Sequence, residues 1–113
     1  MSVFHGIQVY EILENGNLLN AIYTNTGLFN NGVPFIDNEI ARKKTHDNKG
    51  VGGLYDCRYI ETNESQVTSC DLEILKYGAV YTFKWTDKQG GLKWEGLGLM
   101  AGPNHISVSY VKV

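Results

Sequence analysis

The stretch YTFKWTDKQGGLKWEGLGLM, residues 81–100, decides the fold of this chain. Apolar and polar residues alternate in its first half, so Tyr81, Phe83 and Trp85 share one face of an extended strand. The cluster DKQGG at 87–91 then supplies a turn, and a second alternating run follows directly. The stretch therefore predicts a β-hairpin with an aromatic inner face.

The same alternation extends through the whole chain. Runs rich in β-branched and aromatic residues are separated by short clusters of Gly, Asn, Asp and Ser. Seven breaks divide the chain into eight expected strands, at about 7–13, 18–24, 36–43, 54–61, 66–75, 79–86, 92–100 and 105–112. The segment 35–44 fits a strand or a helix, because Ile36 and Ile40 lie four residues apart and Asp37 suits a helix N-cap.

The turn at Asn15-Gly16 sets the register of the first two strands. Both residues tolerate the positive φ angles of a tight hairpin turn, so the flanking apolar runs are expected to pair. A turn centred there places Ile12 opposite Leu19 and Tyr10 opposite Ala21. These four apolar side chains then form one core face.

A four-residue loop at 62–65 would place Cys57 directly opposite Cys70. Cross-strand Cα atoms lie about 4.5–5.5 Å apart, within the reach of a disulfide. In a reducing compartment the same pair would remain two small buried thiols. The sequence leaves open whether the pair is bridged, and both alternatives predict that the two residues are close.

Length, charge and the N-terminal sequence limit the class of protein. The chain fits a single domain, 1–113, and its formal net charge is −2, with 10 Lys and Arg against 12 Asp and Glu. The basic surface of a nucleic-acid-binding protein is absent. The start, MSVFHGIQVYEIL, lacks a basic segment followed by a long apolar core. We therefore expect a cytoplasmic protein with no nucleic-acid or membrane partner.

Eight short sequential strands with mostly tight turns indicate an all-β fold. We expect an eight-stranded antiparallel up-and-down barrel, because closure removes both sheet edges and hairpin turns link the strands from residue 54 onward. The alternative is a two-sheet β-sandwich, which usually needs some longer crossover connections.

Three pieces of sequence, YTFKW, WEGLG and ISVSY, resemble the C-terminal half of small calycin-type barrels, the avidin-like and lipocalin-like group. The resemblance is one of layout, covers about residues 54–113 and implies a barrel from a small bacterial family of this kind. The Gly-x-Trp that opens lipocalins is absent, since the first strand reads HGIQVYEIL.

Aromatic side chains on the expected inward faces are the candidate ligand-binding residues. An eight-stranded barrel holds either packed side chains or one small ligand, and Tyr and Trp combine a large apolar body with a hydrogen-bonding group. The candidates are Tyr55, Tyr59, Tyr81, Phe83, Trp85, Trp94 and Tyr110. Gly96 and Gly98 on the same face would leave space or let the strand bend. The alternative is that these aromatics only fill the core.

We expect a non-enzymatic protein that binds a small apolar or aromatic molecule. The alternative function is a protein-interaction module that uses the outer face, with Leu97 and Leu99, and the loops at the open end, or a homodimer through these two leucines. An enzyme with a tyrosine general acid ranks third, because no base is evident beside any tyrosine. His5, His46 and His105 are scattered, so no metal site and no cofactor are expected.

Overall fold

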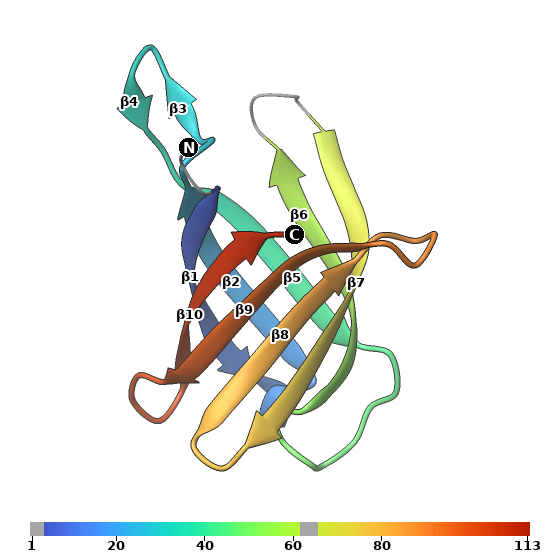
Figure 1. Cartoon of the computed structure of the whole chain (residues 1–113). Helices are drawn as coiled ribbons and strands as arrows, with labels where there is room; N and C mark the ends of the chain where they lie inside the picture. The colour runs from blue at the N-terminus through green and yellow to red at the C-terminus, as the bar shows by residue number, and fades with distance from the viewer. Residues whose placement is uncertain (1–3, 62–65) are drawn as a thin grey trace.

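The alternating pattern buries one face of each of eight strands, and the strands close into an antiparallel barrel (Figure 1). The structure is a computed structural model that describes residues 4–61 and 66–113. Its barrel strands are β1 (His5–Leu13), β2 (Leu18–Asn25), β5 (Asp37–Lys43), β6 (Gly53–Glu61), β7 (Gln66–Tyr77), β8 (Val80–Thr86), β9 (Leu92–Met100) and β10 (His105–Lys112). A 3₁₀ turn, η1 (Glu14–Gly16), and a small hairpin, β3 (Phe29–Asn30) with β4 (Val33–Pro34), complete the elements.

The strand order is β1-β10-β9-β8-β7-β6-β5-β2, and β2 pairs with β1 to close the barrel. The predicted up-and-down barrel is confirmed, and closure excludes the sandwich. Every neighbouring pair is antiparallel, as the tight connections require. The barrel therefore has no free edge strand.

The ambiguous segment 35–44 contains a strand, β5. Its inward residues are Asp37, Glu39, Ala41 and Lys43, whereas Ile36 and Ile40 are 61% and 49% exposed. Three of its four inward residues are ionisable, and of its outward residues only Ile40 is apolar, so β5 lacks the usual hydrophobic alternation of a half-buried strand. It therefore carries ionisable groups into the barrel.

The first hairpin has the predicted register but a different turn. Ile12 pairs with Leu19 and Tyr10 with Ala21. The turn is a four-residue loop, 14–17, because positive φ extends back to Glu14 at 49°, ahead of Asn15 at 57°. The register is unchanged because the longer loop keeps the same centre.

The predicted pairing of Cys57 with Cys70 is confirmed. Both thiols are buried and unbridged. The loop at 62–65 itself lies outside the described residues. Burial raises the pKa of the Cys57 thiol well above its usual range, so Cys57 is a poor nucleophile in the folded protein.

One end of the barrel is closed by η1 and the loop at 44–52. The Lys43 ammonium, inward and buried, donates to the Asp47 carboxylate (2.6 Å) and to the Gly50 carbonyl (2.6 Å). The Tyr55 hydroxyl donates to the Gly16 carbonyl (2.6 Å) at the same end. The opposite end holds the start of β1, the end of β10 and the β3–β4 hairpin (Figure 1).

The space expected beside Gly96 and Gly98 is filled by neighbouring groups. A Cβ on Gly98 would lie 2.7 Å from the Phe83 ring, and one on Gly96 would lie 2.6 Å from the Ser109 carbonyl oxygen. Real Cβ atoms do not approach other atoms so closely. The glycines therefore admit the close packing of β8, β9 and β10, and neither position has room for a Cβ.

Replacement of Gly98 by alanine should destabilise the protein by about 1–3 kcal/mol, because the added methyl overlaps the buried Phe83 ring. Urea denaturation measures the free energy of unfolding. Gly52→Ala is the matched control, because its added Cβ would meet only the Ile74 carbonyl oxygen, at 3.7 Å, and should change stability by less than about 0.5 kcal/mol. Equal stability of the two variants would contradict this packing.

Candidate ligand-binding cavity

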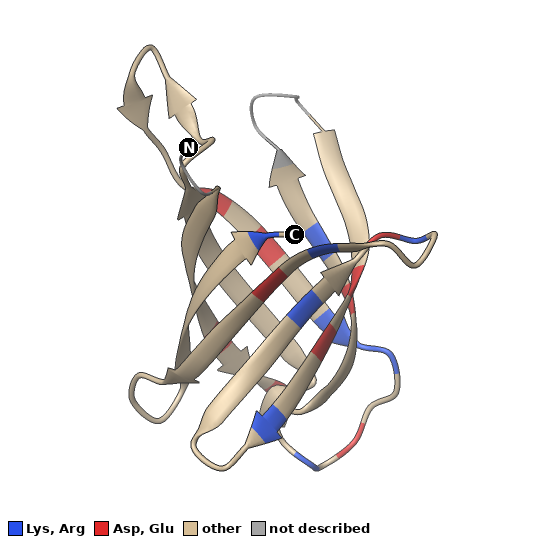
Figure 2. Ribbon diagram, in the orientation of Figure 1, with Lys and Arg blue, Asp and Glu red and all other residues tan. Residues whose placement is uncertain are grey.

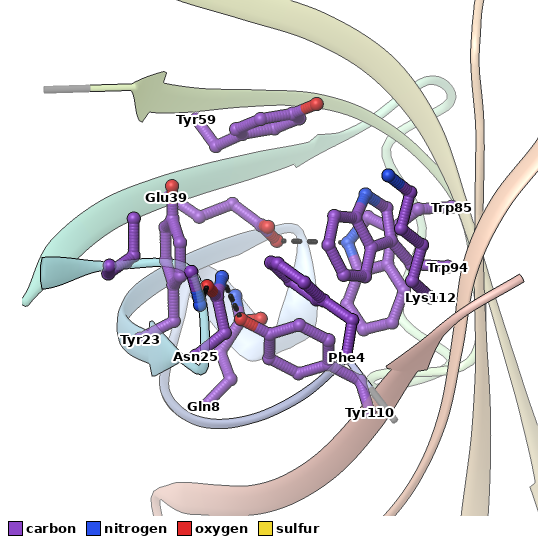
Figure 3. A pocket seen from close by; sticks show the side chains of 12 residues that line it. Phe4, Gln8, Tyr23, Asn25, Glu39, Tyr59, Trp85, Trp94, Tyr110 and Lys112 are labelled. Atoms are coloured by element: carbon purple, nitrogen blue, oxygen red, sulfur yellow. Dashed lines mark hydrogen bonds between the residues drawn. The ribbon is translucent and has the colours of Figure 1, made fainter. Parts of the chain in front are cut away.

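The end of the barrel opposite the closing loop contains a cavity of about 290 Å³ (Figure 3). Ligand pockets begin at about 300 Å³, so this volume suits one small molecule. The lining residues come from seven of the eight barrel strands, from the residue before β1 and from the loop after β2: Phe4, Gln8, Tyr23, Asn25, Gly27, Leu28, Glu39, Tyr59, Trp85, Trp94, Tyr110 and Lys112.

Four of the seven aromatic residues expected in a pocket line this cavity: Tyr59, Trp85, Trp94 and Tyr110. The other three, Tyr55, Tyr81 and Phe83, do not line it. Tyr55 is buried at the closed end, and Phe83 is fully buried between Tyr10 and Trp85, with ring centroids 5.7 Å from each. Alternation places all seven inward but does not indicate their depth in the barrel.

Aromatic rings form a continuous wall from the floor of the cavity to its mouth. Trp85, almost fully buried, has its ring centroid 5.7 Å from that of Tyr110. Tyr110 meets Trp94 edge-on at 5.5 Å, and Trp94 meets Phe4 at 5.2 Å. Edge and offset contacts of this kind hold rings in place. Trp85, Tyr110, Trp94 and Phe4 therefore present a fixed apolar surface.

Hydrogen bonds engage the hydroxyl groups of two tyrosines that line the cavity, Tyr23 and Tyr110. The Tyr23 hydroxyl donates to the Ile60 carbonyl (2.6 Å), across the barrel from β2 to β6. The Asn25 amide donates to the Tyr110 hydroxyl (3.1 Å), as Figure 3 shows. These bonds leave the ring faces as the surface that a ligand would meet.

Glu39 places a carboxyl group deep in the cavity. Its residue is 5% exposed, and its oxygen Oε2 accepts hydrogen bonds from the Tyr10 hydroxyl and from the Trp85 indole nitrogen (3.3 Å). Within the described ranges Glu39 has no salt-bridge partner. Burial raises the pKa of Glu39, and the hydrogen bonds from Tyr10 and its neighbours partly oppose the rise.

Gln8 lies beside this carboxyl and is 3% exposed. Its amide nitrogen Nε2 is buried and has no hydrogen-bond partner in the part of the chain that the structure describes. The amide is near enough to lower the pKa of Glu39, but its geometry does not complete a hydrogen bond. A buried donor without a partner costs about 1–3 kcal/mol, so a ligand acceptor at this point would be favourable.

Sequence reasoning missed eight of the lining residues: Phe4, Gln8, Tyr23, Asn25, Gly27, Leu28, Glu39 and Lys112. Gln8 and Tyr23 were within reach, because the predicted first hairpin puts them in phase with inward Tyr10 and Ala21. Glu39 was not, since β5 turns Ile40 outward and charged residues inward, so the hydrophobic pattern does not indicate its inner face.

Glu39→Gln should raise the melting temperature at about pH 8 and leave it nearly unchanged at about pH 4. A carboxyl whose pKa is raised on folding stabilises the fold fully below its ordinary pKa of 4.5 and loses that contribution as the pH rises through its native pKa. Glutamine does not titrate. For a domain of this size, about 1 kcal/mol corresponds to roughly 4 °C.

Thermal denaturation across this pH range tests the prediction, with the exposed Glu11→Gln as a control for loss of one surface charge. A melting temperature of Glu39→Gln that is equal to or below that of the wild type at every pH would contradict it.

The described residues show neither a metal site nor a membrane helix. Across 4–61 and 66–113 no three His, Cys, Asp or Glu side chains gather to hold a metal ion. No helix in these ranges has the length and apolar character needed to cross a bilayer.

The eight-stranded antiparallel barrel is compatible with a calycin-like layout. Comparison of the chain with protein-family models, curated proteins and solved structures gives no match.

Proposed function

We propose that this protein binds one small apolar or aromatic molecule, without catalysis, in the open half of the barrel. The observation that carries the proposal is the cavity itself, with a fixed aromatic wall and two buried polar groups, Glu39 and Gln8, at its inner end. Ligand sites commonly combine an apolar lining with a few buried polar groups that orient the ligand.

The fold supports the same proposal. Eight-stranded barrels have an interior of the size that suits one small ligand. The resemblance in layout to avidin-like and lipocalin-like barrels is in accord with this, as an analogy of fold alone. The facing but unbridged thiols of Cys57 and Cys70 support a reducing, cytoplasmic setting.

Small aromatic compounds should bind to the protein, and Trp94→Ala should weaken binding by about tenfold or more because it removes one wall of the cavity. Both tryptophans of the chain line the cavity, so intrinsic fluorescence reports occupancy, and Trp85 remains as the reporter in the variant. Tyr77→Ala, at an exposed aromatic residue, is the matched control. A fragment library that leaves the fluorescence of the folded wild type unchanged would contradict the proposal.

A second proposal is self-association through the outer face of β1, β10 and β9. Leu97 and Leu99 are 61% and 56% exposed, as expected from the sequence. The pairing continues from Leu99 through Ser107 to Val9, so uncharged side chains span three strands. Figure 2 shows charged segments on the upper part of β9 and at the end of β10, whereas the lower part of each strand is uncharged. An uncharged apolar face of this kind can pack against a second copy without desolvating ions.

Leu99→Asp should convert a dimer into a monomer and leave fluorescence-detected binding unchanged, because the added carboxylate would be buried in the contact but lies outside the cavity. Light scattering after size-exclusion chromatography measures the mass. Leu54→Asp, at an exposed leucine on β6, is the control. A wild-type protein that remains monomeric at high concentration would overturn the second proposal.

A further inference from the structure

We propose that the ligand is a small organic cation, a protonated amine carried on an apolar or aromatic body, with Glu39 as its counter-ion. This inference rests on the proposed ligand-binding function and specifies the chemistry of the same cavity. It is argued from the charge, the burial and the aromatic surface around Glu39.

The carboxyl of Glu39 lacks a cationic partner. Its hydrogen-bond donors Tyr10 and Trp85 are neutral, as are Gln8 and Cys57 beside it, and no salt bridge of Glu39 occurs within residues 4–61 and 66–113. An ionised carboxylate removed from water is costly unless a cation compensates it. A ligand ammonium entering the cavity would supply that compensation.

The inward charges of β5 divide between the two ends of the barrel. Lys43 is neutralised at the closed end by Asp47. Toward the open end, Glu39 lies on the same inward face and is the acidic residue of the cavity lining. Burial first, and Glu39 in addition, raise the pKa of the Tyr23 hydroxyl, which lines the cavity as well. Lys112 also lines the cavity, but its residue is exposed at the mouth.

The aromatic wall suits the same ligand. Tyr59, Trp94 and Tyr110 lie around the space that Glu39 points toward (Figure 3). Aromatic faces attract ammonium groups through the negative potential of the ring face and also contact an apolar body. The unpartnered amide nitrogen of Gln8 adds a donor for a hydroxyl or ether oxygen beside the amine.

Three probes that share one aromatic body separate charge from shape: phenethylammonium, 2-phenylethanol and phenylacetate. Each is titrated into the wild-type protein at about pH 7, and the fluorescence of Trp85 and Trp94 measures binding. The cation should bind at least about tenfold more tightly than the alcohol, and the anion should bind most weakly.

Glu39→Gln should bring the affinity of the cation down to that of the alcohol and leave the affinity of the alcohol itself nearly unchanged. Gln retains an acceptor for Tyr10 and Trp85 but carries no charge. Glu11→Gln, an equal loss of charge on the exposed face of β1, should keep the preference of the wild type for the cation.

The outcomes separate the two proposals. A preference for the cation that Glu39→Gln abolishes supports the inference. Equal or tighter binding of the alcohol or of phenylacetate overturns the inference and leaves the proposed function standing. If none of the three probes binds, the inference is overturned. The fragment screen then decides the proposed function separately. A neutral fragment that binds the wild type and binds Trp94→Ala more weakly would uphold the proposed function.

Discussion

Ionisable side chains on the inner face of β5 are the constraint around which this barrel is organised. A charge inside a closed sheet must be compensated, by an opposite charge or by strong hydrogen bonds. Lys43 meets this requirement through Asp47 and the Gly50 carbonyl, which fix the loop that covers one end. Glu39, four residues earlier, has only the neutral donors Tyr10 and Trp85. One strand therefore carries both Lys43, which anchors the loop at the closed end, and Glu39, a carboxyl without a salt bridge to the described residues, at the open end.

Aromatic packing separates the two halves. Tyr10, Phe83 and Trp85 are stacked in series across the interior, with interplanar angles of 8° and 21°. Gly98 lets the Phe83 ring approach β9 closely enough to complete this layer. On the closed-end side of this layer the core is packed, and on the open-end side Trp85 forms the floor of the cavity. The glycines of β9 allow this layer to pack closely, and they do not line the cavity, which lies at the open end of the barrel.

The fold was largely predictable from the sequence, and the cavity only in part. Tight turns and a period of two residues fix register, so the pairing of Cys57 with Cys70 followed from counting. Alternation also gives the face of each strand, which placed Trp85 and Tyr110 inward. It does not give depth, so Tyr55 at the closed end could not be told from Tyr59 at the open end. Glu39 was missed because β5 turns Ile40 outward and charged residues inward, so the hydrophobic pattern does not indicate its inner face. Only the pairing of β5 with β2 and β6 settles which side is enclosed.

The central claim is that the open half of this barrel is a binding site. Native mass spectrometry of the protein, purified without reductant from the cells that produce it, tests this claim most directly. The account predicts a folded protein with excess mass that is lost on denaturation, and an amine within the released molecule. A folded protein that carries no excess mass, and gains none when the extract of the same cells is added back, would contradict it.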